Sequence, residues 1–301
     1  MKRYKKVIVP LGISDSDDAA ISWASKVSKM ANSQEVLFIH AVEVDDIPEA
    51  TKEKYPWLLK PLDQTLLDRM KAKVEAIWDG NPEAKIDFKV TDSKSIVLSI
   101  LEEVLKQESD LVIIGRDAFG SDVAVRLARK APCSVMAVPT GIDRTLEKIV
   151  VANDFSEQTV TAFDVATAFA EAEGLSEIDS LHIFSVGQLT HRAAIPESEL
   201  IQISLDHAME VHKEHLNSVE SKEISILPNE AHSKLVPQGI VSEARKMEAD
   251  LIVTGCRGRN TVVALLLGSN AEELLKISPV PVIAVKEKGT GQKLIEALLG
   301  S

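Results

Sequence analysis

Residues 108–115 read Glu-Ser-Asp-Leu-Val-Ile-Ile-Gly, and residues 248–255 read Glu-Ala-Asp-Leu-Ile-Val-Thr-Gly. In both stretches an aspartate precedes a short, almost continuously apolar run that ends at a glycine. Such a run is typical of a strand that is buried on both faces of a parallel sheet. The near-identity of the two stretches predicts that the chain holds two copies of one fold.

Further matches extend the repeat in both directions. Residues 6–9 match residues 148–151 at an offset of 142 positions, and His40 and His182 recur in the next apolar run at the same offset. Each first run is followed by Ser and acidic residues, which are signals for a helix N-terminus. Four more stretches complete the two copies, as helices at 18–31 and 158–172 and as proline-bounded strands at 131–138 and 278–285.

Strands that alternate with helices predict an α/β fold with parallel βαβ units and helices on both faces of the sheet. We therefore expect two tandem, open, doubly wound domains, at residues 1–141 and 142–288, and a C-terminal tail at 289–301 with a short helix. Each half also has a longer polar middle segment, at 44–81 and 187–220, which we interpret as a loop leading into an amphipathic helix.

Charge and composition exclude several classes of protein. The net charge of −12 would repel a phosphate backbone, so nucleic acid is not expected as a partner. No apolar stretch reaches the length of a membrane span, and none near the N-terminus forms a secretory core. Cys133 and Cys256 form no metal or redox motif. We expect a cytoplasmic protein.

A glycine-rich loop in the second half points to a phosphate ligand. Gly255 and Gly258 are followed, after nine residues, by Gly268 and Ser269. Open parallel sheets bind ligands at the carboxyl ends of their strands, and a following helix offers free N–H groups to an anion. Ser269 also opens a sequence of capping-box form. The alternative is that these residues only end a strand and cap a helix.

Asp154 strengthens the ligand interpretation because it follows another strand of the same half. Its carboxylate would lie at the same sheet edge as the loop and could accept hydrogen bonds from ribose hydroxyls. An aspartate that only caps a helix is the competing interpretation.

The glycine spacing, together with residues 150–156 and the strand at 181–183, resembles the nucleotide-binding branch of the universal stress protein family. The resemblance covers nearly the whole chain as two copies. It implies a Rossmann-like, five-stranded parallel sheet of the adenine nucleotide alpha hydrolase type in each half. It also implies ATP or a related adenine nucleotide such as AMP as the ligand, with or without Mg²⁺.

Transferred position by position, the resemblance makes Asp154 the ribose partner and places Ile183 against adenine. It places the other site residues beside the base (Ala152, Asn153) and around the phosphates (Gly255, Arg257, Gly258, Gly268, Ser269, Asn270). Ala152 stands where the family often has proline. The implied role is that of a regulatory or stress-response protein with at most slow ATP hydrolysis. A protein-interaction module without nucleotide remains an alternative.

The first copy has lost these features. Gly12 stands where the second copy has Asp154, and 17 positions separate Gly115 from Pro132, against 24 between Gly255 and Pro279. Asp117 and Asp122 stand in or beside the shortened loop, where they would repel phosphate. We expect the first half not to bind ATP in the same way. By resemblance, the two halves would pair through their last strands, and a further homodimer stays open.

Histidines offer two further candidates. His40 and His182 recur in both copies, which favours a structural role over a catalytic one. His207, Glu210, His212 and Glu214 fall in the second middle segment without the spacing of a metal site, so we expect a solvated helix there. Cys256, inside the loop, is interpreted as a passive small residue.

Overall fold

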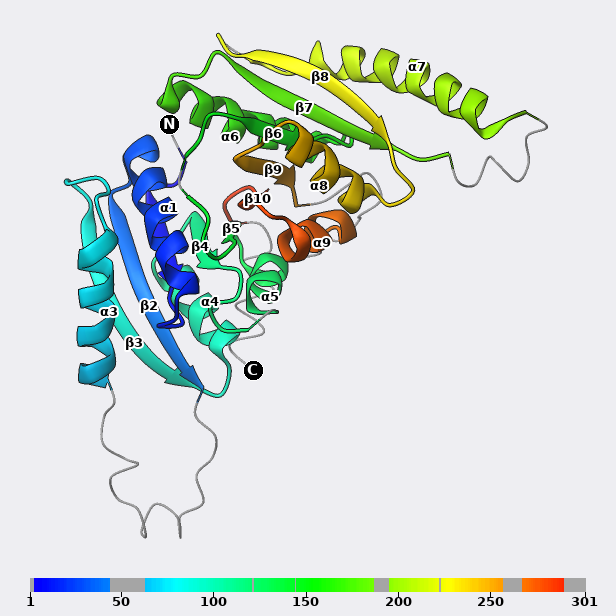
Figure 1. The fold of residues 1–301 in the computed structure, drawn as a ribbon. Helices are drawn as coiled ribbons and strands as arrows, with labels where there is room; N and C mark the ends of the chain where they lie inside the picture. Colours follow the sequence, from blue (N-terminus) through cyan, green and yellow to red (C-terminus); the bar gives the residue numbers. More distant parts are fainter. Residues whose placement is uncertain are drawn as a thin grey trace.

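The ten strands of the computed structural model form one continuous sheet (Figure 1) among the residues that the structure describes, which are 3–43, 63–120, 122–143, 145–186, 195–221, 223–256 and 267–289. The order across the sheet is β3-β2-β1-β4-β5-β10-β9-β6-β7-β8. The strands of the first half are β1 (Lys6–Pro10), β2 (Glu35–Glu43), β3 (Lys85–Ser93), β4 (Leu111–Gly115) and β5 (Ser134–Val138). Those of the second half are β6 (Ile149–Ala152), β7 (Glu177–Phe184), β8 (Ser225–His232), β9 (Leu251–Gly255) and β10 (Val282–Val285).

Both halves have the same internal strand order, and all pairs within each half are parallel. Their last strands, β5 and β10, pair in the antiparallel sense, with Met136 opposite Ile283. The predicted α/β class, with a parallel five-stranded unit in each half, is therefore confirmed. The two units are joined edge to edge, so that they share one sheet instead of forming two separate ones.

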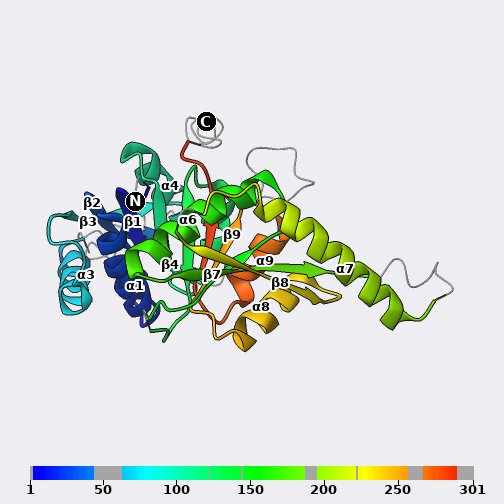
Figure 2. The same ribbon diagram turned by 90° about the horizontal axis from the view of Figure 1, so that it is seen from above.

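Helices cover both faces of this sheet (Figure 2). Side chains of α4 (Ile96–Lys106), α5 (Val123–Lys130), α8 (Val236–Lys246) and α9 (Ser269–Ile277) form one core layer with the sheet. Those of α1 (Ser16–Ala31), α3 (Asp63–Ile77) and α6 (Glu157–Glu173) form the other, and the end of α7 (Glu197–Leu216) packs against it. Each layer contains residues of both halves, so the apolar core is shared between them.

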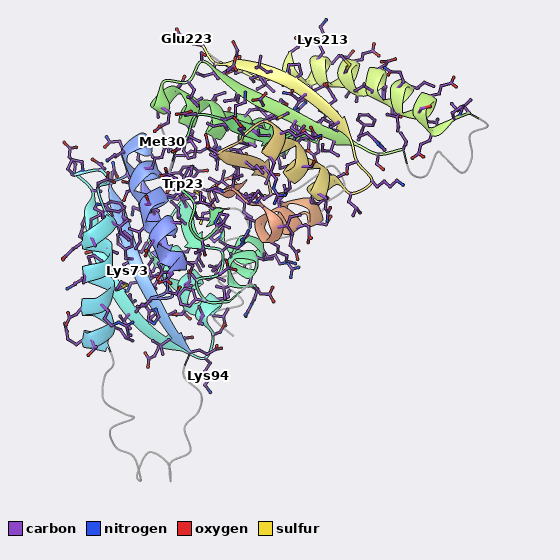
Figure 3. All side chains as sticks on the ribbon, in the orientation of Figure 1. Trp23, Met30, Lys73, Lys94, Lys213 and Glu223 are labelled. Carbon is purple, nitrogen blue, oxygen red and sulfur yellow. The ribbon has the colours of Figure 1, made fainter. Side chains whose placement is uncertain are left out.

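Specific contacts also join the halves. Lys26 of α1 pairs with Glu173 of α6 at 2.6 Å, and Trp23 Nε1 donates to the Asp143 carbonyl at 3.1 Å. Trp23 lies in the interior between α1 and the sheet, whereas Lys94 and Lys213 project outward (Figure 3). On the opposite face, Arg129 of α5 binds Glu272 of α9.

The outer strands of the sheet are the elements that the sequence patterns did not locate. β3 and β8 lie at the two edges, and β8 contains Pro228, which a central strand does not tolerate. The described parts of the two middle segments form α3 and α7, as expected. Residues 44–62 and 187–194 and the expected tail helix, at 292–299, lie outside the described residues. No helix in the described part of the chain has the length and apolar character that a membrane crossing requires.

Candidate functional site

A cavity of about 370 Å³ lies at the carboxyl ends of β6, β7 and β9. The chain leaves β6 and β9 toward opposite sides of the sheet, and such a switch point is where open parallel sheets bind ligands. Its volume falls within the range of about 300–1,000 Å³ found for small-molecule sites. Eight of the ten predicted site residues line it: Ala152, Asn153, Asp154, Ile183, Gly255, Gly268, Ser269 and Asn270. Arg257 and Gly258 lie outside the described residues.

Asp154 forms the turn between β6 and α6. Its Oδ1 accepts hydrogen bonds from Ser156 N at 3.1 Å and from Thr159 Oγ1 at 2.8 Å. The N-cap residue of α6 is Ser156, so the interpretation of Asp154 as a simple helix cap is wrong. Because both bonds are made to Oδ1, Oδ2 has no hydrogen-bond partner among the described residues and is available to a ligand.

The N-terminus of α9 forms the opposite wall of the cavity. Gly268 N donates to Cys256 O at 2.7 Å, which holds this helix start against the end of β9. Ser269 is the first residue of α9, as expected, and Gly268 is its N-cap. The first helical N–H donor is that of Glu272, so the N–H groups of residues 269–271 precede the helical ladder and can receive an anion.

The expected capping box at Ser269 does not form. Glu272 binds Arg129 and Lys276 instead of turning back toward the helix start. These two cations lower the pKa of the Glu272 carboxyl. The glycine at the end of β9 has a packing role besides any ligand role, since a Cβ on Gly255 would lie 3.2 Å from Gln158.

The corresponding strand end of the first half is filled by its own loop. A Cβ on Gly12 would lie 1.6 Å from the carbonyl oxygen of Ala118, so no side chain fits where the second half has Asp154. The short turn places Ala118 N in a hydrogen bond to Gly115 O at 3.1 Å. Asp117 is half-exposed, and its carboxylate lies 3.8 Å from the Arg116 guanidinium. The shortened loop therefore replaces the ligand space with backbone.

The two repeated histidines make equivalent contacts in the two halves. His40 Nδ1 lies 2.7 Å from Leu11 O, and His182 Nδ1 lies 2.8 Å from Asn153 O. In each case the carbonyl is that of a residue directly after the first strand, so Nδ1 carries the proton and donates. The first half, whose strand end is filled by its own loop, and the second half, which has the cavity, make the same contact. This fits the structural role expected for both histidines.

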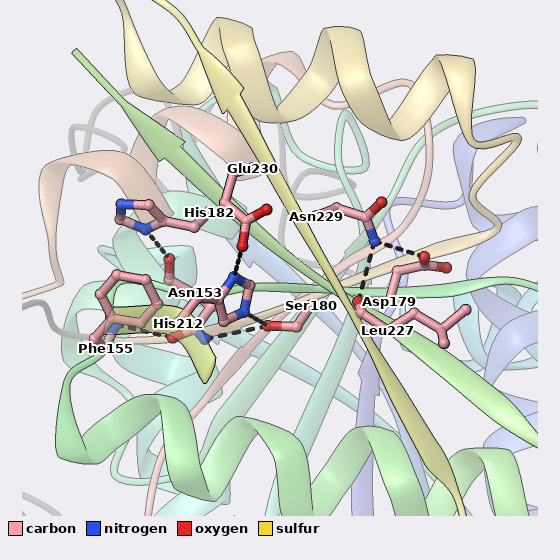
Figure 4. Close-up of polar contacts among 9 residues, drawn as sticks. All are labelled: Asn153, Phe155, Asp179, Ser180, His182, His212, Leu227, Asn229 and Glu230. Carbon is pink, nitrogen blue, oxygen red and sulfur yellow. Dashed lines mark hydrogen bonds and ion pairs between the residues drawn. The ribbon is translucent and has the colours of Figure 1, made fainter. Parts of the chain in front are cut away.

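A buried polar network that no sequence pattern indicated lies beside the cavity (Figure 4). His212 of α7 was expected on a solvated helix, but its side chain is fully buried. Its Nε2 lies 2.6 Å from Ser180 Oγ, and its Nδ1 lies 2.7 Å from Glu230 Oε1. His207, Glu210 and Glu214 are exposed as expected, and no group of three metal ligands gathers in the described part of the chain.

Burial governs the protonation of this network. It lowers the pKa of His212 to about 4, and neighbouring His215 acts in the same direction. Burial also raises the pKa of Glu230. The distance between His212 and Glu230 would suit an ion pair, but with a pKa this low His212 is neutral near pH 7. Its Nδ1–H then donates to Glu230, and the Ser180 hydroxyl donates to Nε2.

Comparisons with known proteins match both halves of the chain to one family. The family model of the "Universal stress protein family" matches residues 3–139 and again residues 145–286. The chain is 22% identical over 307 residues to the universal stress protein E homolog of Haemophilus influenzae, covering 94% of this chain and 98% of that relative. It is 30% identical over 146 residues to a universal stress protein of Methanocaldococcus jannaschii, covering 47% of this chain and 82% of that one.

Solved structures show the same fold over the full length. A universal stress protein from Archaeoglobus fulgidus superposes with a TM-score of 0.59 at 16% identity, covering 95% of this chain and 97% of that chain. A putative universal stress protein from Pseudomonas aeruginosa superposes with a TM-score of 0.60 at 16% identity, covering 99% and 98%.

Proposed function

Since the chain belongs to the universal stress protein family, we propose that it is a regulatory or stress-response protein that binds one adenine nucleotide, ATP or AMP, in its second half. The observation that carries this proposal is the cavity in which the Asp154 carboxylate faces the N-terminus of α9. A carboxylate for hydroxyl groups and a helix N-terminus for an anion are the two polar functions that a nucleotide needs.

The remaining walls of the cavity suit the base. Ala152, Leu181, Ile183, Val236 and Ile240 give it an apolar lining at the ends of β6 and β7 and along α8. An adenine ring would bury its faces against these side chains. Backbone groups of the strand end at residues 152–154 would meet its polar edge.

The phosphates would lie over the first turn of α9. Here Gly268 presents no side chain, and Ser269 adds a hydroxyl group to the backbone N–H donors. The protein as a whole is strongly acidic, with a net charge of −12, so attraction of a nucleotide depends on these local dipoles. The proposed phosphate contacts of Arg257 and Gly258 belong to the same loop.

Mg²⁺ would enter with the nucleotide. The described residues hold no group of three acidic, histidine or cysteine side chains that could bind a metal alone. Mg²⁺ is commonly bound through substrate phosphates and one or two protein oxygens, and Asp154 and Ser269 are the oxygen donors at this cavity.

The first half would act as a built-in partner. It covers the outer edge of β10 through the pairing with β5, and it packs α5 against α9. This arrangement leaves one nucleotide site per chain. Further pairing of two chains into a homodimer stays a prediction.

Isothermal titration with ATP tests the proposed function. We expect one site per chain, with an affinity at least tenfold lower in Asp154→Ala, because hydrogen bonds to a charged acceptor contribute about 1.5–3 kcal/mol each. Asp117→Ala, in the filled loop of the first half, is the matched control and should bind as the wild type does. Absence of heat at about 1 mM ATP would mean that any binding free energy is weaker than about −4 kcal/mol. This result would contradict nucleotide binding and favour an interaction module.

A hydrolysis assay separates binding from catalysis. We expect steady-state turnover below about one per minute, far under the median enzyme value of about 10 s⁻¹. Faster turnover that Asp154→Ala abolishes would instead make the protein an ATPase.

A further inference from the structure

The buried network of Ser180, His212 and Glu230 joins three separate elements of the second half. Ser180 lies on β7, His212 on α7 and Glu230 on β8, and Figure 4 shows their side chains joined in succession by hydrogen bonds. Ser180 and His212 are fully buried, and the Glu230 side chain is 9% exposed. The network continues to Asn153, whose Nδ2 donates to Ser180 Oγ at 3.1 Å.

Asn153 connects this network to the wall of the cavity. Its side-chain oxygen accepts from Phe155 N at 2.8 Å, and its backbone carbonyl accepts from His182. Phe155 has a positive φ of 62° and stacks on the His182 ring at 4.2 Å. Asp154 lies between Asn153 and Phe155, so its place in the cavity depends on how both neighbours are held.

The first half provides an internal control for these four positions. It carries an apolar side chain at every one of them, and three of these are fully buried while the fourth is partly buried. The pairs are Leu11 for Asn153, Phe38 for Ser180 and Met70 for His212, at the offset of 142 residues, and Val90 for Glu230, because Val90 pairs with His40 as Glu230 pairs with His182. Phe38, in the place of Ser180, stacks on its β3 neighbour Phe88 with ring centroids 5.5 Å apart.

This contrast shows that the fold does not require the polar network. Buried polar groups need complete hydrogen bonding to avoid a loss of stability, and an apolar set of suitable shape avoids that demand. The same architecture is built on apolar side chains in the half whose ligand space is filled. The polar set therefore belongs with the open cavity.

We propose that Ser180, His212 and Glu230 are positioning residues of the nucleotide site, which hold Asn153 and the turn at Asp154 in the conformation that binds ribose and base. This inference rests on the proposed function. A role for Ser180 as a nucleophile does not fit the structure, because its hydroxyl is fully buried and already accepts from Asn153.

Acid should disturb this arrangement through His212. A proton on Nε2 removes the acceptor of the Ser180 hydroxyl. The hydroxyl then has to rotate, and its hydrogen bonds to His212 and Asn153 are rearranged. The titratable groups that face His212 are Glu230 from β8, His182 from β7 and His215 from its own helix. Since burial lowers the pKa of His212 to about 4, the network is intact near pH 7 and is lost as the pH falls toward that value.

The test is titration with ATP between pH 7.5 and about 4, the pKa of His212, for the wild type, His212→Met, His212→Gln and Glu230→Gln. Met70→Leu, at the equivalent core position of the first half, is the matched control. His212→Met should fold, since methionine fills this place in the first half. We expect a loss of affinity of roughly three- to tenfold at pH 7.5 in His212→Met and Glu230→Gln, and no loss in Met70→Leu.

His212→Gln should recover part of the affinity, because its amide can still bond Ser180. The ratio of wild-type to His212→Gln affinity cancels the titration of the nucleotide itself and should fall as the pH falls. A merely structural role would leave that ratio constant. Equal affinities of all variants for ATP at every pH would overturn the positioning role alone. Failure of the wild type to bind ATP would overturn the proposed function together with it.

Discussion

The two halves of the chain share one strand order but place a carboxylate at different points of the same turn. In the second half Asp154 follows β6 and takes Thr159 of α6 as a partner. In the first half the acid is Asp17 of α1, at the position equivalent to Thr159, and it bonds Gly12 N at 3.0 Å and Ser14 N at 2.8 Å.

The position of the carboxylate decides whether the turn can offer an acceptor to a ligand. Asp17 is fully buried beneath its own turn, and burial raises its pKa despite the backbone donors. Asp154 is partly exposed and lines the cavity. An inward carboxylate stabilises the turn, whereas an outward one offers an acceptor to a ligand. Repeats with the same backbone can thus diverge into a scaffold and a site.

The largest expected loss of stability comes from adding one methyl group at Gly12, where the loop of the first half fills the strand end. Gly12→Ala would push a Cβ into the Ala118 carbonyl, and overpacking of this kind typically costs about 1–3 kcal/mol. We expect a loss near the top of that range in urea unfolding. Asp154→Gly, the reverse change at the equivalent position, should cost less than half as much stability while it weakens nucleotide binding. An unchanged urea midpoint for Gly12→Ala would contradict the filled geometry.

The next effect concerns the stability of the nucleotide-free protein in acid. An unfolded histidine takes up a proton near pH 6.5, but His212 does so in the folded protein only near pH 4. The unfolded state therefore binds more protons between these values, so stability is complete above pH 6.5 and falls as the pH drops through this window. The loss should reach about 2–3 kcal/mol in the wild type.

Urea unfolding at a series of pH values measures this loss. His212→Met, which cannot titrate there, should lose correspondingly less stability, and Met70→Leu should follow the wild type. Parallel pH profiles for His212→Met and the wild type would show that His212 is not the group responsible.

The smallest loss of stability is expected at the contact between α5 of the first half and α9 of the second half. Arg129 and Glu272 join α5 to α9, but the Arg129 side chain is 52% exposed. Exposed ion pairs contribute about 0–1 kcal/mol and weaken in salt, so Arg129→Ala should lower stability by less than about 1 kcal/mol, and by less still at high salt. A loss above about 2 kcal/mol would mean that the halves depend on this pair more than on the shared core.

The sequence located the central strands and half of the residues that line the cavity, because both are encoded locally. A buried parallel strand is a continuous apolar run, and a ligand-facing strand end shows as glycine or aspartate directly after it. The edge strands β3 and β8 lack such runs, since each has a single strand neighbour and tolerates polar side chains and Pro228.

Features that arise from distant contacts were less accessible. The capping box expected at Ser269 fails because Arg129, from the other half, takes the Glu272 carboxylate. The burial of His212 depends on Ser180 and Glu230, which are far from it in the chain. Alignment of the repeats at 142 residues places Met70 opposite His212, and this apolar residue was the available indication in the sequence that the helix position faces the core.

Native mass spectrometry of the protein with excess ATP most directly tests the central claim that only the second half holds a nucleotide. We expect one nucleotide per chain in the wild type, one in Asp117→Ala and none in Gly268→Asp, whose added carboxylate would stand at the N-terminus of α9. Two nucleotides per chain, or one that persists in Gly268→Asp, would contradict the division of the molecule into a scaffold half and a binding half.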